Sequence, residues 1–340
     1  MNHNYKNVFD SPAAYYDPRN LSPVPLFKLP PELVPFPRGD RVHYYAQAAY
    51  LWPLGSLKHP AVWHMLQMAQ ERGELDGVHT IADSSSGSTA YCEALLAHYR
   101  GIKTVLYVPS DIPKTKENRL RDLVDMKVNI ELTKCSEDQG EPSAMQQACL
   151  KGKEGGCFYL GQYQNPDNVE GHELYHIKPA WEQTNGEMTI YAGGLGTCGH
   201  IGAALKFFKR TAPVAVVAGY CAEKNPLPGI RTLKRLETVP LAKICLDPEN
   251  QDIHRIEVLQ NKAYQSSWKL SIAGIKGGPT SGAAKVALDT YLLAQRQNPD
   301  AWEALRNRDG NIVAVFMCGD GKDLYSIEKY LQSLDSNEIP

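Results

Sequence analysis

The sequence has no apolar run long enough to cross a membrane, and its first residues lack the apolar core of a secretion signal. A membrane span needs about 20 consecutive apolar residues, and a secretion signal needs roughly 7 to 15. An excess of charge of one sign is also missing, because 36 basic residues stand against 38 acidic ones. Without such a field we expect neither nucleic acid nor a membrane as a partner. These absences favour a cytoplasmic protein that acts on small molecules.

Cysteine pairs with the spacing of metal ligands are absent as well. The eight cysteines are scattered, none belongs to a Cys-x-x-Cys pair, and several stand in apolar runs, as Cys318 does. Zinc sites and disulfide frameworks need paired or regularly spaced cysteines. The scatter is typical of reduced, buried thiols in a cytosolic protein, and we predict no metal site.

Regular periodicity is missing from residues 1–45, where six prolines between residues 23 and 37 disfavour a helix. We expect this segment to wrap a surface as an arm. From residue 78 onward, short apolar runs alternate with amphipathic segments, which is typical of an α/β fold with mainly parallel sheets. Strands are predicted at residues 78–82, 102–108, 128–132, 157–160, 188–192, 214–219 and 311–318, and helices at 89–100, 113–126, 142–153, 168–184, 199–210, 281–297 and 324–334.

The length of 340 residues favours two domains, with a boundary near residues 162–168, where polar residues and a proline interrupt the alternation. Glycines dominate the predicted strand-to-helix turn at residues 193–200. They let backbone N–H groups converge at a helix N-terminus, which builds an anion site. The spacing matches neither the phosphate loop of NTPases nor the dinucleotide-binding fingerprint. A phosphomonoester fits better, and the alternative is a turn without a ligand.

Hydroxyl groups dominate a second strand-to-helix turn, at residues 84–89, which suits a carboxylate or a ring oxygen, or alternatively only caps the helix. Lys58 stands in a third unusual segment, the turn-forming residues 53–60, just before a predicted helix. A lysine held in a partly desolvated bend loses its proton more readily and can form a Schiff base with a carbonyl. The alternative is an ordinary solvated surface charge.

Five segments, in order along residues 20–330, resemble motifs of the cysteine synthase and cystathionine β-synthase family, which are fold type II pyridoxal-phosphate enzymes. Pro-Leu-Gly-Ser-Leu-Lys-His-Pro at residues 53–60 resembles the family's Asn-Pro-x-Gly-Ser-x-Lys-Asp-Arg segment. Residues 85–90 resemble its Thr-Ser-Gly-Asn-Thr-Gly substrate loop, and residues 196–200 its Gly-Thr-Gly-Gly-Thr phosphate loop. Residues 162–166 match its Gln-Phe-x-Asn-Pro segment, and residues 278–282 its Ser-Ser-Gly segment.

The resemblance implies pyridoxal 5'-phosphate as the cofactor, a homodimer, and an α/β fold of the tryptophan synthase β-like type. In that fold each of two lobes is a mainly parallel sheet flanked by helices. The smaller N-terminal lobe, which carries the substrate loop, would span residues 46–164. The larger cofactor lobe would comprise residues 18–45 and 165–335, and residues 1–17 would form an N-terminal arm.

The resemblance also implies a role for single residues. Lys58 would hold the cofactor as a Schiff base and later move the α-proton of the substrate. The other cofactor-binding residues would be Ser88, Thr280 opposite the pyridine nitrogen, and a phosphate loop of Gly196, Thr197, Cys198, Gly199 and His200. The residues that bind the amino-acid substrate would be Ser85, Ser86, Gly87, Thr89, Gln162 and Arg231.

Several positions depart from the family pattern. Ser88 replaces the asparagine that contacts the cofactor ring, and the residues around the lysine differ at Trp52, His59 and Pro60. His200 replaces a threonine, where it could add charge to the phosphate or cap the helix. Arg231 could bind a phosphate or a second carboxylate, or be a surface charge. Cys198 could be a reactive thiol at a helix N-terminus, although a small residue that fills the loop is the better account.

The function that the resemblance implies is β-replacement on an O-activated L-serine, either O-acetyl- or O-phospho-L-serine, through an aminoacrylate intermediate. The nucleophile would be sulfide, a thiol or an amine. The neutral hydroxyl of Thr280 leaves the ring a weaker electron sink than a carboxylate would, which favours this chemistry. One alternative is a lyase that performs β-elimination, as a cysteine desulfhydrase or a serine or threonine dehydratase. Another is a non-catalytic family member that acts as a binding partner.

Overall fold

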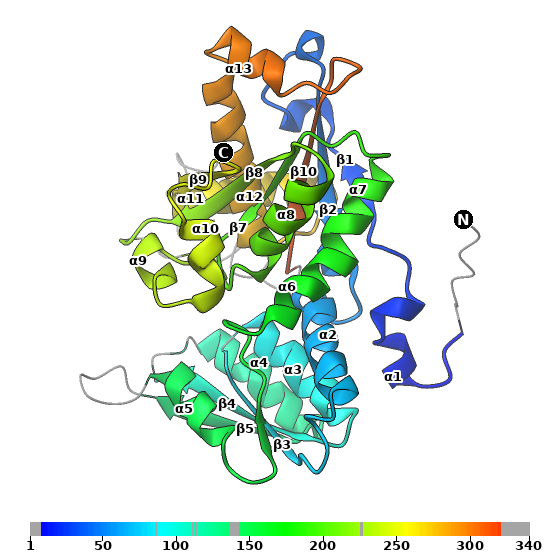
Figure 1. Cartoon of the computed structure of the whole chain (residues 1–340), viewed down its shortest axis with the longest axis vertical. Coiled ribbons are helices and arrows are strands. Elements are labelled where there is room, and N and C mark those ends of the chain that lie inside the picture. The colour runs from blue at the N-terminus through cyan, green and yellow to red at the C-terminus, as the bar shows by residue number, and fades with distance from the viewer. Residues whose placement is uncertain are drawn as a thin grey trace. The chain divides into compact units, whose positions relative to one another are not determined.

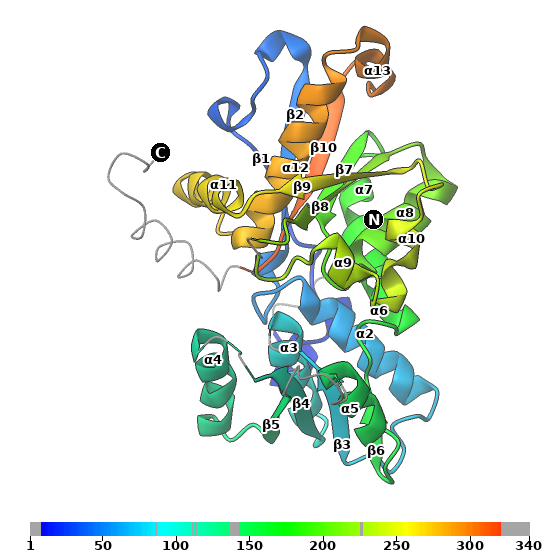
Figure 2. The ribbon, with the colours of Figure 1, turned by 90° about the vertical axis from the view of Figure 1, so that its left-hand side faces the viewer.

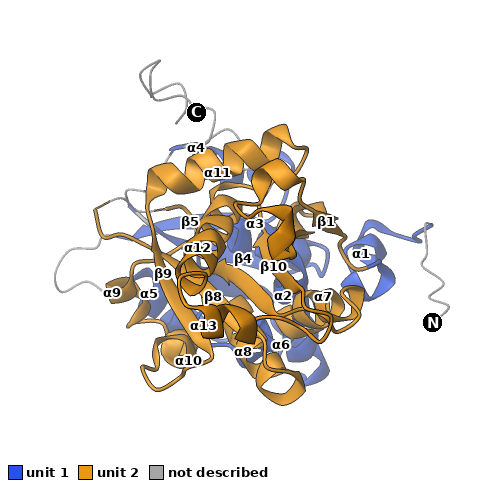
Figure 3. Cartoon of the chain, turned by 90° about the horizontal axis from the view of Figure 1, so that it is seen from above, with its two compact units in different colours: residues 1–22, 58–171 blue, residues 23–57, 172–340 orange. Residues whose placement is uncertain are grey.

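A computed structural model describes residues 8–85, 87–110, 112, 114–135, 143–224 and 227–320. The predicted helix at residues 324–334 and the predicted substrate residue Ser86 lie outside the described residues. The chain forms two compact units, one of residues 1–22 and 58–171 and the other of residues 23–57 and 172–340 (Figure 3). Within the described part of the chain, no helix is both long and apolar enough to cross a membrane.

The smaller unit is built on a four-stranded parallel sheet with the strand order β5-β4-β3-β6 (Figure 1). Its strands are β3 (Thr80–Ser84), β4 (Lys103–Pro109), β5 (Ile130–Cys135) and β6 (Cys157–Tyr159). Helices α3 and α5 both pack on β3, and α2 packs on α3. The helices of this unit are α1 (Pro12–Tyr15), α2 (Lys58–Glu71), α3 (Ser88–His98), α4 (Lys114–Asp125), α5 (Ala144–Lys151) and α6 (Pro166–His172).

The larger unit is built on a six-stranded sheet with the order β1-β2-β10-β7-β8-β9. Every pair is parallel except β1 with β2. The strands are β1 (Leu26–Lys28), β2 (Val42–Ala48), β7 (Ile190–Gly194), β8 (Ala215–Cys221), β9 (Ile253–Val258) and β10 (Ile312–Cys318).

Helices cover both faces of this sheet, with α11 and α12 on one face and α7 and α8 on the other (Figure 2). Strand β10 lies in the sheet interior, and all of its seven residues are buried, as expected for a parallel strand covered on both sides. The helices are α7 (Lys178–Gln183), α8 (Gly199–Thr211), α9 (Leu233–Leu236), α10 (Lys243–Leu246), α11 (Gln260–Ile272), α12 (Pro279–Gln295) and α13 (Pro299–Ala304).

The predicted alternation is confirmed from β3 to β8, but several details differ. Residues 1–45 are not a plain arm, because Ser11 caps α1 with Pro12 at its first position, and β1 and the start of β2 follow. Strand β9 and helix α11 were not predicted. The predicted helix at residues 168–184 is interrupted by a π-helical segment, Glu173–Ile177, because Pro179 in the next turn has no N–H to donate.

The unit boundaries also differ from the predicted residues 46–164. Residues 46–57 go with the larger unit, because β2 pairs along its whole length with β10. Residues 8–22 go with the smaller unit, where the Arg19 guanidinium lies 4.6 Å from the centre of the Trp63 ring. The chain therefore passes from the smaller unit to the larger and back before helix α2 begins.

Candidate active site

Lys58 is the first residue of α2, whereas the sequence predicted that it lies just before the helix. The lysine is half-buried, and Gly55 in that segment has a φ of 67°, a conformation that favours glycine. The next residue, His59, is fully buried, and its Nε2 lies 2.8 Å from the carbonyl oxygen of Tyr16. Burial lowers the pKa of His59 to about 4, so that its ring is neutral at pH 7. A neutral, hydrogen-bonded ring thus anchors the backbone beside Lys58.

The hydroxyl-rich turn at residues 84–89, called the serine loop from here on, begins at the end of β3 and leads into α3. The hydroxyl oxygen of Ser85 accepts hydrogen bonds from the backbone N–H groups of Gly87 (3.4 Å) and Ala90 (3.2 Å). Ser85 therefore stabilises the start of the helix, and its own O–H proton is still able to bind an acceptor such as a carboxylate. Ser88 and Thr89 occupy the first two helical positions and are buried.

Gln162 lies against this loop, as the resemblance implies. Its Nε2 donates to the carbonyl oxygen of Ser84 across 2.9 Å, and only 2% of the residue is exposed. The preceding Gly161 has a φ of 67°, which turns the chain back after β6. The structure therefore brings together the two segments that are predicted to bind the substrate carboxylate.

Asp83 was missed by the sequence reasoning. It is fully buried at the end of β3, and its two carboxylate oxygens accept from the backbone N–H groups of Ser84 (2.7 Å) and Gln162 (3.3 Å). Burial raises the pKa of Asp83 to about 7, although both hydrogen bonds act in the opposite direction. An acidic residue at a strand end, directly before a hydroxyl-rich loop, is the sequence signal that could have revealed it.

The glycine-rich loop of the larger unit connects β7 to α8. Cys198, the N-cap residue of α8, has a φ of 65°, and its side chain makes no capping hydrogen bond. The first turn of a helix without such a cap presents N–H groups and a positive dipole end, which suit a phosphate. Cys198 is buried, and its thiol contacts Cys245, whose pKa it raises. This packing agrees with a residue that fills the loop.

Close approach of another backbone segment requires glycine at position 196 of this loop, and a side chain packs closely on position 194. A β-carbon on Gly196 would lie 2.6 Å from the carbonyl oxygen of Gly229, and one on Gly194 would lie 2.8 Å from a side-chain carbon of Ile230. The backbone N–H of Arg231 also donates to the carbonyl oxygen of Leu195 across 2.8 Å. The segment with Arg231 therefore lines the predicted phosphate loop, and only hydrogen fits between them.

His200 in the first turn of α8 directs its imidazole toward buried polar groups. Its Nε2 lies 2.7 Å from the hydroxyl of Tyr191, which itself donates to Oε1 of Gln47 across 2.9 Å. The hydroxyl has one proton, so Nε2 of His200 is the donor in their bond. The ring lies 5.5 Å from that of His172 and 6.5 Å from that of His176, centre to centre.

Thr280 stands in the first turn of α12, near the same loop. A β-carbon on Gly229 would lie 2.9 Å from the methyl carbon of Thr280. The Thr280 hydroxyl oxygen is shielded from solvent and has no hydrogen-bond partner among the described residues. An orphaned hydroxyl of this kind is suited to form a hydrogen bond with a ring nitrogen of a ligand.

The residues of the larger unit thus fit pyridoxal 5'-phosphate. The uncapped first turn of α8 suits the phosphate, the glycine contacts shape the loop, and the orphaned hydroxyl of Thr280 suits the pyridine nitrogen. Of the predicted residues, the larger unit brings together residues 196–200, Arg231 and Thr280. The smaller unit brings together the described residues of the serine loop and Gln162, and it carries Lys58.

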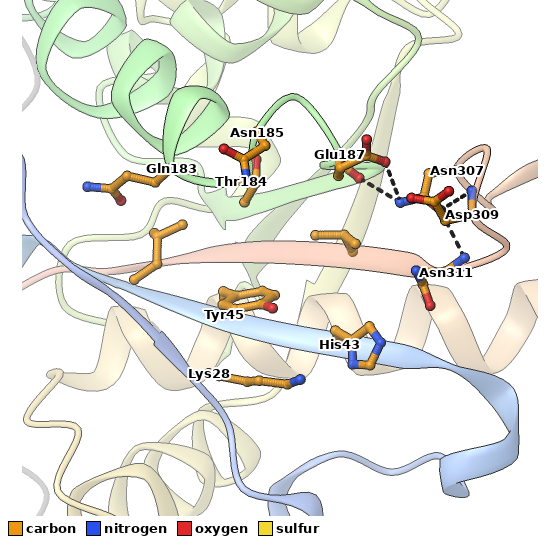
Figure 4. A pocket seen from close by; sticks show the side chains of 12 residues that line it. Lys28, His43, Tyr45, Gln183, Thr184, Asn185, Glu187, Asn307, Asp309 and Asn311 are labelled. Carbon is orange, nitrogen blue, oxygen red and sulfur yellow. Dashed lines mark hydrogen bonds between the residues drawn. The ribbon is translucent and has the colours of Figure 1, made fainter. Parts of the chain in front are cut away.

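A separate polar pocket of about 530 Å³ lies in the larger unit, at the ends of the strands that are opposite to the glycine-rich loop (Figure 4). Lys28, His43 and Tyr45 of strands β1 and β2 form one side, and Asn185 and Asn311 stand on the loops before β7 and β10. It therefore lies at the amino ends of β2, β7 and β10, whereas the glycine-rich loop follows the carboxyl end of β7. None of the predicted site residues lines this pocket.

Comparison with known proteins identifies the family of this chain. The sequence profile of a family described as "Pyridoxal-phosphate dependent enzyme" matches residues 22–302. Cysteine synthase B of Escherichia coli (strain K12) is 27% identical over 271 residues, which cover 79% of this chain and 82% of that protein.

Two solved structures show the same fold at low sequence identity. One is an O-acetylserine-dependent cystathionine β-synthase from Helicobacter pylori, with a TM-score of 0.71, 20% identity, and coverage of 91% of this chain and 96% of the other. The second is O-ureido-L-serine synthase, with a TM-score of 0.75, 18% identity, and coverage of 97% and 98%.

Proposed function

Because the chain belongs to the family of pyridoxal-phosphate dependent enzymes, we propose that it catalyses β-replacement on an O-activated L-serine. The substrate is O-acetyl- or O-phospho-L-serine, and the incoming nucleophile is sulfide, a thiol or an amine. The observation that carries this proposal is the orphaned hydroxyl of Thr280. A neutral group opposite the pyridine nitrogen favours loss of a β-substituent over full carbanion chemistry. The similarity to cysteine synthase B supports the same reaction class.

The residues of this chain divide the work as follows. Pyridoxal phosphate, when bound, supplies an electron sink that acidifies the α-carbon of the amino acid. Lys58 Nζ attaches the cofactor covalently and moves the α-proton. The first turn of α8 and the loop before it hold the phosphate. The hydroxyl of Ser85 and the amide of Gln162 orient the substrate carboxylate, and Arg231 binds an anionic group of the substrate.

The remaining features of the proposal are assembly and location. The enzyme works as a homodimer in the cytoplasm. The described cysteines are all free, and most of them are buried, which is compatible with a reducing compartment. Sedimentation of the purified protein would test the assembly.

The reaction is tested with Lys58→Ala and with Lys153→Ala, which changes an exposed lysine of the same unit. After loading with pyridoxal phosphate and reduction with borohydride, wild type and Lys153→Ala are expected to retain the cofactor on a peptide that contains Lys58. Lys58→Ala is expected to retain none. Wild type should form cysteine from O-acetyl-L-serine and sulfide. A covalent adduct in Lys58→Ala contradicts the assignment, and rapid release of pyruvate from cysteine alone would favour elimination.

A further inference from the structure

We propose that Asp83 is a positioning residue for the substrate, because its carboxylate fixes the serine loop to the Gln162 segment. The buried acid Glu93 faces Asp83, and the pair holds at most one negative charge. This inference rests on the proposed function, in which these two segments receive the substrate carboxylate. Neither acid has a role in the mechanism described above. Both are fully buried in the smaller unit.

The Asp83 side chain takes the place of a backbone hydrogen-bond acceptor at the point where β3 and β6 diverge. The last regular backbone bond between the strands runs from the N–H of Leu160 to the carbonyl oxygen of Ala82 (3.1 Å). Beyond it, the backbone N–H of Gln162 donates to Asp83 Oδ2, and the Gln162 side chain donates to the Ser84 carbonyl oxygen. The side chains of Asp83 and Gln162 thus make the hydrogen bonds between the two segments that backbone groups make within a sheet.

Each of the two joined segments also has its own anchor. Asn168 Nδ2 donates to the carbonyl oxygen of Gln162 across 2.6 Å, which fixes that segment to α6. Ser85 fixes the other segment to α3 through the cap described above. The bonds of Asp83 and of the Gln162 amide connect these two anchored pieces. The spacing between them, and so the fit to a substrate carboxylate, depends on this connection.

Glu93 on α3 is the acid that faces Asp83. Neither of its carboxyl oxygens has a hydrogen-bond partner among the described residues. Burial and the charge of Asp83 raise the pKa of Glu93 well above its usual range, which favours the protonated form of Glu93. A second charge beside Asp83 would be costly in this apolar surrounding. The pair therefore holds one negative charge at most.

Tyr159, Cys149 and Tyr163 are the other titratable groups around the pair. Tyr159 on β6 has a buried hydroxyl without a partner among the described residues, and burial and then Asp83 raise its pKa. Cys149 of α5 and Tyr163 face Tyr159 in turn. Among the described residues, no lysine or arginine shifts the pKa of Asp83 or Glu93.

The protonation of Asp83 gives the inference its pH dependence. The ionised carboxylate accepts from both N–H groups, whereas a protonated carboxyl replaces one acceptor with a donor. Since the pKa of Asp83 is raised to about 7, the connection is half formed near pH 7, becomes complete well above that pH, and is lost as the pH falls below it. We expect KM for the amino acid to rise on acidification, while kcat changes less, because the residue positions substrate and does not touch the reacting atoms.

Asp83→Asn tests the connection directly, with Asp76→Asn as the matched change of an exposed acid in the same unit. Hydrogen exchange is followed by mass spectrometry of peptides that contain Ser84 and Gln162, and KM and kcat are measured with O-acetyl-L-serine and sulfide. For Asp83→Asn at pH 8 we expect exchange about tenfold faster at Gln162, and KM about tenfold higher with kcat within about twofold. Asp76→Asn should behave as wild type.

Glu93→Gln is the second variant, and it tests the inference even if Asp83→Asn fails to fold. It keeps the shape of protonated Glu93 and adds or removes no charge beside Asp83, so we expect the pH midpoints of KM and of Gln162 exchange to stay near pH 7, as in wild type. Midpoints that fall by about one unit in Glu93→Gln would contradict the part assigned to Glu93, because they would show an ionised Glu93 beside Asp83. A KM and a Gln162 exchange without a midpoint near pH 7 in wild type, or unchanged exchange in Asp83→Asn, overturn the role of Asp83 whatever the reaction is. Absence of turnover by wild type contradicts the proposed function instead, so the two failures are distinguishable.

Discussion

The Nε2 atom of His59 lies 2.8 Å from the main-chain carbonyl oxygen of Tyr16. A carbonyl only accepts hydrogen bonds, so the ring carries its proton on Nε2. The two aromatic rings also meet edge to face, with their centres 6.0 Å apart. Because His59 is the residue after Lys58, this pair connects the N-terminal segment of the smaller unit to the start of the helix that carries the lysine.

We expect His59→Ala to lower the free energy of unfolding by about 2–4 kcal/mol, because it leaves a cavity and an unpaired carbonyl. Burial lowers the pKa of His59 from 6.5 to about 4, so the neutral ring contributes stability that is complete above pH 6.5. That contribution, about 3 kcal/mol, is lost as the pH falls from 6.5 to 4. Urea unfolding between pH 4 and 8 measures both effects.

Gln70→Ala is the control for this prediction, because Gln70 is exposed on the same helix. We expect it to change the free energy of unfolding by less than about 0.5 kcal/mol and to keep the pH dependence of wild type. His59→Ala should lose the part of the pH dependence between 6.5 and 4. If wild type and His59→Ala showed the same slope in that range, the ring would not be the group that titrates.

Gly196→Ala tests the phosphate loop. The new β-carbon would stand 2.6 Å from the carbonyl oxygen of Gly229, so the loop or the segment beyond it must move. We expect the affinity for pyridoxal phosphate to fall by about tenfold or more, measured by titration of the unloaded protein and followed by fluorescence. Gly39→Ala, where a β-carbon would meet nothing within 4 Å, should bind the cofactor as wild type does. Equal affinities for the two variants would remove this loop from the cofactor site.

Local patterns predicted the elements whose signal lies in their own residues. The strand β10 could be identified in the sequence because burial on both faces produces a continuous apolar run. The entry to α8 could be identified because its glycines are adjacent in the sequence. Strand β9 could not, because its six residues mix apolar and charged side chains and pair only along one side, with β8. An edge strand of this kind is defined by its partner, which lies far away in the sequence.

The candidate site divides in the same way. Lys58 and the two helix-entry loops stand out because turn residues are concentrated around them. The bond between Gln162 and Asp83 spans 79 positions, and the bond between His59 and Tyr16 spans 43. Neither residue pair has a spacing rule, because a buried acid or imidazole is recognised only when its surroundings are assembled. These long-range polar contacts are the part that required the structure.

Thr280→Val separates the effect of the orphaned hydroxyl on stability from its effect on cofactor affinity. Because the Thr280 hydroxyl has no partner among the described residues, replacing it with a methyl group of similar size should leave the free energy of unfolding of the cofactor-free protein unchanged or raise it by up to ~1 kcal/mol. The same change should lower the affinity for pyridoxal phosphate by about tenfold, because the ring nitrogen then faces a methyl group. Thermal unfolding with and without the cofactor measures both quantities.

Thr290→Val is the matched control, since Thr290 is exposed on the same helix and donates its hydroxyl proton to the Val286 carbonyl oxygen across 2.8 Å. Cofactor affinity should be that of wild type in this variant. A Thr280→Val protein that bound the cofactor with wild-type affinity would show that the hydroxyl does not meet the ring nitrogen. The proposal of β-replacement would then lose the observation on which it depends. The opposite signs expected for stability and affinity make this the most discriminating single substitution in the site.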